Sequence, residues 1–125
     1  MPGRRVVVVE DDAGLRTALE KVLSAGGHSP AMFESAEALL ESGAAAGAGC
    51  LVLDIRLPGM SGVELYRELA ARGDAPPVIF MTAYDDPAVR GETELLGAAA
   101  YLVKPFRGRE LVDAVSETLG VNAGR

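Results

Sequence analysis

Four short segments in which every residue is apolar restrict the fold of this chain more than any other feature. They cover residues 6–9, 50–53, 78–81 and 101–103, and 29–33 is a weaker fifth segment. A strand that is apolar at every position, and not only at every second one, is covered on both faces. This pattern is typical of a parallel sheet lying between two layers of helices. The sequence therefore predicts an α/β fold.

Apolar residues at helical spacing fill the intervals between these segments and would face the sheet. They are Leu15, Leu19, Val22 and Leu23 in the first interval, Leu39 and Leu40 in the second, Val63, Tyr66 and Leu69 in the third, and Leu111, Val115 and Leu119 after the last strand. Ser61 and Glu64 match a capping box that starts the third helix, and Asp86-Pro87 predicts the start of the fourth. Five successive α/β units result.

The length of 125 residues and the hydrophobic content of 49% suit a single domain with one buried core. We expect one domain over 1–125, with its folded core at about 4–119 and a flexible tail or the start of a linker at 120–125. The glycine-rich and alanine-rich stretch 43–49 is expected to form a surface loop.

Charge and composition exclude several functions. A formal charge of -6 argues against direct nucleic-acid binding by this segment. The single Cys50 excludes a disulfide framework or a cysteine metal site, and suits a reducing cytoplasm. The apolar run near the start of the chain is too short for a signal peptide or a membrane span. A cytoplasmic protein without membrane contact is the expectation.

Polar residues follow four of the apolar segments. They are Glu10-Asp11-Asp12 after the first, Asp54 after 50–53, Thr82 after 78–81, and Lys104-Pro105 after 101–103. Because ligand sites in open parallel sheets lie beyond the carboxyl ends of the strands, we expect these residues to meet at one edge of the sheet.

The acidic residues at this edge indicate a cation site. Helix capping explains Asp12, since an acid before a first helical turn accepts from free N–H groups. It does not explain Glu10 and Asp11 facing Asp54, because close carboxylates repel one another unless a cation joins them. With oxygen ligands alone, Mg²⁺ (or Mn²⁺) is favoured over zinc.

Asp54, Thr82 and Lys104 each have a structural explanation as well as a chemical one. Asp54 precedes the turn at Leu57-Pro58-Gly59, and taken alone it fits the role of a turn residue as well as a chemical one. Beside Mg²⁺, however, a carboxylate can attack a phosphoryl group while fixed cations neutralise its oxygens. Lys104 could be such a cation or a solvated charge, and Thr82 could donate to a phosphoryl oxygen or cap the next turn.

In their order and spacing, these motifs resemble the receiver domain of two-component response regulators. The resemblance runs from residue 6 to about 119. It rests on the strand into Glu10-Asp11-Asp12 with Leu15-Arg16, on Leu-Asp54-Ile-Arg-Leu-Pro-Gly-Met-Ser-Gly62, on Met81-Thr82-Ala83 and on Gly97-Ala-Ala-Ala-Tyr101-Leu-Val-Lys104-Pro105-Phe106. Ser35-Ala36-Glu37 and Ser61-Gly62-Val63-Glu64 look most similar to the nitrogen-fixation (LuxR-type) transcriptional regulators.

The resemblance implies a flavodoxin-like (βα)5 doubly wound sheet of strand order 2-1-3-4-5, and it implies roles for particular residues. Asp54 would accept a phosphoryl group from a phosphohistidine of a sensor histidine kinase. Asp11, Asp54 and the backbone carbonyl of Arg56 would bind Mg²⁺, with Glu10 acting through a water. Lys104 would contact the phosphoryl group. Thr82 would turn toward it, and the ring of Tyr101 would turn inward. Lys104-Pro105 is similar to the family's cis peptide.

The resemblance also implies an output. Phosphorylation would alter the face formed by the fourth helix, fifth strand and fifth helix, where two copies of the chain could form a homodimer. Transcription is the expected output, through a separate DNA-binding domain. Gly91 and Thr93 have low helix propensity and predict a mobile fourth helix. We further hypothesise that Arg56 and Tyr84 crowd the attacking water and prolong the life of the phosphate.

Three other functions remain to be weighed. A phosphate or flavin binder on this fold needs a glycine-rich or hydroxyl-rich loop at the first helix, where this chain has three acids. A haloacid-dehalogenase-type phosphatase would carry a second Asp where Arg56 stands. An interaction module that is never phosphorylated would not need the full set of acids, Thr82 and Lys104. The expectation is thus a substrate for transient phosphorylation, not a multiple-turnover enzyme. His28 is expected in a surface turn without a role.

Overall fold

Five strands form one parallel sheet, and the predicted α/β fold is confirmed. The computed structural model describes residues 5–121. Its strands are β1 (Val6–Val9), β2 (Pro30–Phe33), β3 (Cys50–Asp54), β4 (Val78–Thr82) and β5 (Ala100–Val103). They pair in the order β2-β1-β3-β4-β5, with all four pairings parallel, as the family resemblance implied.

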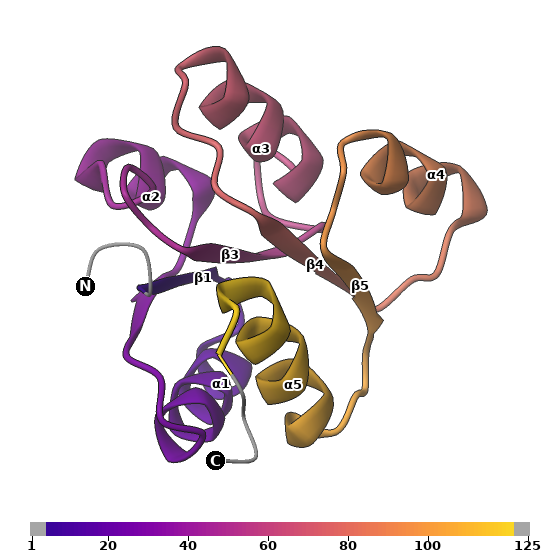
Figure 1. Ribbon diagram of the computed structural model, residues 1–125. Helices are drawn as coiled ribbons and strands as arrows, with labels where there is room; N and C mark the ends of the chain where they lie inside the picture. Colours follow the sequence, from indigo (N-terminus) through magenta and orange to yellow (C-terminus); the bar gives the residue numbers. More distant parts are fainter. Residues whose placement is uncertain (1–4, 122–125) are drawn as a thin grey trace.

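Five helices alternate with the strands and cover both faces of the sheet (Figure 1). They are α1 (Ala13–Ala25), α2 (Ala36–Ser42), α3 (Gly62–Ala71), α4 (Pro87–Leu95) and α5 (Gly108–Leu119). Helices α1 and α5 lie on one face, and α2, α3 and α4 lie on the other. Within residues 5–121, none of the helices combines the length and the apolar character that a membrane crossing requires.

The side chains of each central strand alternate between two cores, which is why the strands are apolar throughout. Val7 and Val9 of β1 belong to the core beneath α2 and α3. Val6 and Val8 of the same strand belong to the core beneath α1 and α5. All four valines are fully buried.

The expected helix starts are present. Asp12 caps α1 by accepting from the N–H of Leu15. Ser61 and Glu64 form both hydrogen bonds of the capping box at α3. Asp86 caps α4 and is followed by Pro87, whose fixed φ suits a first helical position. These caps fix where each helix leaves the edge of the sheet that carries the polar residues.

Some expectations about loops need amendment. The stretch 43–49 does leave α2 through Gly43, whose φ is 70°, but Ala45 and Ala48 are buried in the core and not exposed. His28 is only half-buried and its Nε2 lies 3.1 Å from Oγ of Ser116 in α5. Burial lowers the pKa of His28. For the tail expected at 120–125, Gly120 ends α5 with a φ of 74°, while 122–125 lie outside the described residues.

Candidate functional site

The carboxyl ends of β1, β3, β4 and β5 bring the predicted site residues to one edge of the sheet. Val9 pairs with Leu53, so Glu10 and Asp54, the residues that follow this pair, lie side by side at the ends of neighbouring strands. Asp54 pairs with Met81, and Thr82 pairs with Val103. Lys104 follows directly, and its N–H donates to the carbonyl of Thr82 over 2.7 Å. The parallel register thus accounts for the convergence.

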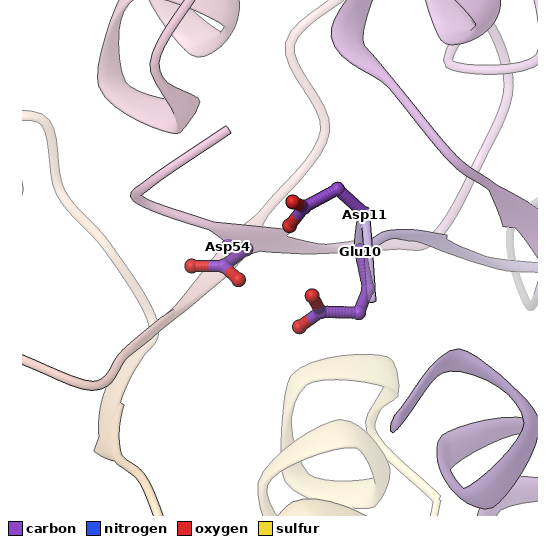
Figure 2. Close-up of side chains that lie close together, drawn as sticks. All are labelled: Glu10, Asp11 and Asp54. Atoms are coloured by element: carbon purple, nitrogen blue, oxygen red, sulfur yellow. The ribbon is translucent and has the colours of Figure 1, made fainter. Parts of the chain in front are cut away.

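Three carboxylates form the centre of the site. Glu10, Asp11 and Asp54 each have a carboxylate oxygen within 4.8 Å of the other two. Figure 2 shows their side chains reaching toward one another from β1 and β3. Glu10 and Asp54 are almost fully buried, whereas Asp11 is exposed. Buried carboxylates at this separation repel one another, so the arrangement favours a bound cation.

The donor atoms of this cluster suit a hard metal ion. All three side chains offer oxygen, the ligand type that Mg²⁺ and Mn²⁺ prefer. The exposed carboxylate of Asp11 leaves one side of the cluster open to solvent, and Mg²⁺ commonly keeps several waters when it binds to proteins. The residues present therefore fit the predicted metal.

Lys104 neutralises the buried part of the cluster. Its Nζ donates to Oε1 of Glu10 over 2.8 Å and to Oδ2 of Asp54 over 2.7 Å. Burial by itself would lower the pKa of Lys104, but the hydrogen bonds to Asp54 and Glu10 and the charges of these carboxylates outweigh it and raise the pKa. Lys104 is therefore a charged partner of the two acids and not a solvated surface lysine.

Backbone contacts hold the acidic loop in place. The N–H of Asp12 donates to Oε2 of Glu10 over 3.0 Å. A guanidinium nitrogen of Arg16, in the first turns of α1, donates to the carbonyl of Glu10 over 2.9 Å and to that of Asp11 over 3.3 Å. Arg16 belonged to the recognised motif, but no role was assigned to it. The one sequence feature that could have indicated this role is its position four residues after Asp12, the residue that caps α1.

Gly62 allows α3 to start directly against the backbone of Asp54. A Cβ at position 62 would lie 3.0 Å from the carbonyl carbon of Asp54 and closer still to its oxygen. The N–H of Gly62 also donates to the carbonyl of Ile55 over 2.9 Å. Sequence reasoning gave Gly62 no function of its own, because the close approach depends on the tertiary path of the 55–61 loop.

Thr82 and Arg56 both contact Tyr84, and Arg56 also contacts Asp54. The hydroxyl of Thr82 accepts from the N–H of Tyr84 over 3.0 Å and donates to its carbonyl over 2.9 Å. The N–H of Arg56 donates to Oδ1 of Asp54 over 3.1 Å. The guanidinium of Arg56 stacks on the ring of Tyr84, 4.1 Å from its centroid. Thr82 therefore caps the following turn, which is the structural role considered for it from the sequence.

Tyr101 lies further from the acids, on the α4 side of β5. It pairs in register with Phe80 and packs against the core beneath α2 and α3. The guanidinium of Arg90 in α4 covers its ring, 4.6 Å from the centroid. Lys104-Pro105, which connects β5 to the next loop, is a cis peptide.

This parallel sheet with an acidic edge, a paired lysine and a neighbouring hydroxyl is the arrangement that the resemblance to receiver domains implied. The response regulator receiver domain model matches residues 6–116, and the chain belongs to that family. Such domains carry signals, and the fold and the family resemblance are both confirmed.

Named relatives agree. The chain is 41% identical over 118 residues to the transcriptional regulatory protein FixJ of Azorhizobium caulinodans, covering 94% of this chain and 56% of FixJ. The solved response regulator StyR matches with a TM-score of 0.85 at 40% identity, over 97% of this chain and 61% of that one. A response regulator receiver protein from Burkholderia phymatum matches with a TM-score of 0.82 at 38% identity, over 97% and 98%. The chain thus spans little more than half the length of FixJ.

Proposed function

We propose that Asp54 accepts a phosphoryl group from a phosphohistidine of a sensor histidine kinase. One observation carries this proposal: the buried carboxylate of Asp54 lies between two further acids and the ammonium of Lys104. An aspartate held only as a turn residue needs neither of these neighbours. In the transfer, the phosphorus–nitrogen bond of the phosphohistidine breaks and a phosphorus–oxygen bond to Asp54 forms. The leaving imidazole keeps the electron pair of the broken bond.

Asp11, Asp54 and the backbone carbonyl of Arg56 would hold Mg²⁺ (or Mn²⁺), with Glu10 acting through a water. The metal would supply neutralising charge to the phosphoryl oxygens. Lys104 supplies a second, permanent charge, and it can exchange its bond to Oδ2 of Asp54 for one to a phosphoryl oxygen. Arg16 and the N–H of Asp12 keep the acidic loop from relaxing when Lys104 turns.

Thr82 would then detect the modification. Its hydroxyl carries one proton, which it now donates to the carbonyl of Tyr84. When it donates to a phosphoryl oxygen instead, the bond to Tyr84 is lost, and the added charge and acceptor oxygens favour a second conformation. The expected readout is the face formed by α4, β5 and α5, where two phosphorylated copies could form a homodimer.

Arg56 and Tyr84 would control how long the phosphate lasts. Each is joined through its backbone to a residue of the site, Arg56 to Asp54 and Tyr84 to Thr82. Their side chains stack on one another and so join the β3–α3 and β4–α4 loops. This stack supports the hypothesis that they hinder the attacking water. The domain would thus catalyse its own phosphorylation and only a slow dephosphorylation.

The wider setting is part of this proposal. The protein would act in the cytoplasm, where Cys50 stays reduced, and would bind no nucleic acid through this segment, given its charge of -6. DNA would be contacted through a separate output domain, with transcription as the output. The folded unit would extend over about 4–119 of a single 1–125 receiver domain.

Intact mass spectrometry tests the proposal. The protein is incubated with Mg²⁺ and acetyl phosphate, a small phosphodonor, and compared with Asp54→Ala. We expect a mass gain of one phosphoryl group in the wild type and none in the variant. Continuous release of inorganic phosphate at high turnover would instead indicate a phosphatase. An unchanged mass under all conditions would indicate an interaction module.

A further inference from the structure

The three acids of the site are not held in the same way. Both carboxylate oxygens of Glu10 accept a hydrogen bond within the protein, and so do both carboxylate oxygens of Asp54. For the exposed carboxylate of Asp11, residues 5–121 provide no such bond. The direction of the Asp11 side chain therefore depends on how its backbone is held.

Arg16 holds that backbone from the first turn of α1. Its Nη1 donates to the carbonyl of Glu10 over 2.9 Å and to the carbonyl of Asp11 over 3.3 Å. These carbonyls belong to the two peptide groups that flank the Cα of Asp11. Because a peptide group is planar, holding both of them fixes the two backbone dihedrals of Asp11 and with them the direction of its side chain. Figure 2 shows that direction, with the carboxylate of Asp11 turned toward that of Asp54.

The guanidinium is itself attached to a firm support. The N–H of Arg16 donates to the carbonyl of Asp12 over 2.8 Å, and the side chain of Asp12 caps α1 by accepting from the N–H of Leu15. The Arg16 side chain is half-buried and thus already ordered in the protein without a metal. The cost of ordering a long side chain is met on folding and does not fall on the binding of a cation.

The same bonds decide which oxygens of the loop face a cation. Backbone carbonyls, like carboxylates, bind hard metal ions. The carbonyls of Glu10 and Asp11 are both occupied as acceptors, and both are turned toward the positive charge of Arg16. The loop therefore presents its carboxylates, and not its carbonyls, to the cation site.

We propose that Arg16 is a positioning residue for the metal: by holding the two peptide groups that flank Asp11, it directs the Asp11 carboxylate into the cation site before a cation arrives. This inference rests on the proposed function, in which Asp11 binds Mg²⁺. A ligand that is held in its binding position in advance loses less conformational freedom on binding, so the affinity rises.

The charge of Arg16 acts in the opposite direction. A guanidinium near a cation site repels a divalent ion, so an arginine that acted through its charge alone would weaken metal binding. Removal of Arg16 thus separates the two effects by their sign, because lost positioning weakens metal binding and lost repulsion strengthens it. The effect of charge also fades as ionic strength rises, whereas the effect of positioning does not.

Mn²⁺ is the probe for this test, because the electron paramagnetic resonance signal of the free ion reports how much is bound. The apparent Kd is measured for the wild type, Arg16→Met and Arg16→Lys at low and at high salt. We expect Arg16→Met to raise the Kd by roughly three- to tenfold at both salt concentrations, the effect of one lost hydrogen bond. Arg16→Lys keeps a charged donor nitrogen on a shorter side chain and should recover part of the loss.

An effect that passes through Asp11 should disappear with Asp11. In the Asp11→Ala background, Arg16→Met should therefore leave the Mn²⁺ Kd unchanged. Phosphorylation by acetyl phosphate gives a second readout, because a variant with weakened metal binding is rescued by more metal. Arg16→Met should slow phosphorylation at low Mg²⁺ more than at saturating Mg²⁺.

Arg5→Met is the matched control. The guanidinium of Arg5 also donates to a backbone carbonyl, that of Ala44 over 2.9 Å. Arg5 directly precedes β1, however, and so lies at the end of this strand opposite to the acids. Its substitution removes the same kind of bond and should leave the Mn²⁺ Kd unchanged.

Two results would overturn the proposal. One is an unchanged or lowered Kd in Arg16→Met, with the urea midpoint showing that the variant is folded, and the other is an equal effect of this substitution with and without Asp11. Failure of the proposed function is recognised separately. A wild type that bound Mn²⁺ but accepted no phosphoryl group would contradict that function, and the comparison of Kd values would still decide the role of Arg16. A wild type that bound no Mn²⁺ would contradict both.

Discussion

The Nζ of Lys104 lies 2.7 Å from Oδ2 of Asp54 and also contacts Glu10, so one ammonium group joins the ends of β1, β3 and β5. The acids are almost fully buried and the lysine side chain is 18% exposed. In this arrangement the lysine performs two tasks. It neutralises the acids before any metal binds, and in the proposed function it would also contact the phosphoryl oxygens.

Lys104→Met should destabilise the protein by about 2–4 kcal/mol, because it leaves two buried carboxylates without their cation. Mg²⁺ should restore much of this loss, since it would supply the missing charge. Urea denaturation with and without Mg²⁺ measures both effects. Lys21→Met, at an exposed position of α1, is the control and should change stability little. Equal stability of the two variants would contradict the pairing.

The stability that Lys104 contributes should depend on pH in the alkaline range. Burial lowers the pKa of Lys104, but the hydrogen bonds and charges of Asp54 and Glu10 dominate and raise it above its ordinary value of 10.5. The folded protein therefore holds this proton more tightly than the unfolded chain does, and stability is lost as pH rises through the folded-state pKa. The difference in unfolding free energy between wild type and Lys104→Met should be constant from about pH 8 to pH 10 and shrink above that. A difference that grew with pH would be inconsistent with this assignment.

Much of the fold could be predicted because its signals are local. The apolar runs mark the strands, and the limits of the strands in the structure differ from the expected ones by one residue at most. Ser61 and Asp86 mark helix starts through their own side chains. The order of the strands could not be derived from periodicity and came from the family resemblance. Burial of Ala45 and Ala48 was missed because glycine-rich composition reports backbone freedom and says nothing about packing.

The candidate site, like the fold, could be predicted from the sequence only in part. Strand ends identified Glu10, Asp54, Thr82 and Lys104, since parallel strands end at one edge of a sheet. The contact of Lys104 with Glu10 could not be predicted from a local pattern, because the two residues are 94 positions apart in sequence. The covering of the Tyr101 ring by Arg90 depends on how α4 packs beside β5, which no local pattern encodes.

Removal of the stack between Arg56 and Tyr84 should shorten the life of the phosphate. We expect Arg56→Ala and Tyr84→Ala each to speed loss of the label from phosphorylated protein about two- to fivefold, the amount expected from one partly exposed cation–π contact. The double variant should be no faster than the faster single one, because either change removes the same stack. Decay is followed by intact mass after the phosphodonor is removed.

Tyr84→Phe is the matched control for this experiment. It keeps the ring and loses only a hydroxyl of a side chain that is largely exposed, so its decay should equal that of the wild type. Unchanged decay in both alanine variants would refute the role of the stack.

Gly62→Ala should disturb Asp54 through its backbone. The added methyl group would press on the Asp54 carbonyl, which is backbone and cannot turn aside as a side chain could. We expect a loss of about 1–3 kcal/mol in unfolding free energy, in the range found for overpacked sites. Phosphorylation by acetyl phosphate should slow, and Mg²⁺ binding should weaken in the same variant. The metal measurement matters because a loss of stability alone would not displace the carboxylate in the folded molecules.

Gly91→Ala in the middle of α4 shows whether glycine replacement is harmful in itself. A Cβ there would meet no atom within 4 Å, so the substitution should raise the unfolding free energy by up to about 1 kcal/mol through helix propensity.

If Gly62→Ala folded with wild-type stability and accepted the phosphoryl group at the wild-type rate, the contact between α3 and Asp54 would not position the acceptor. Because the metal and phosphorylation measurements use only the folded fraction, a partly unfolded variant still gives a decisive answer.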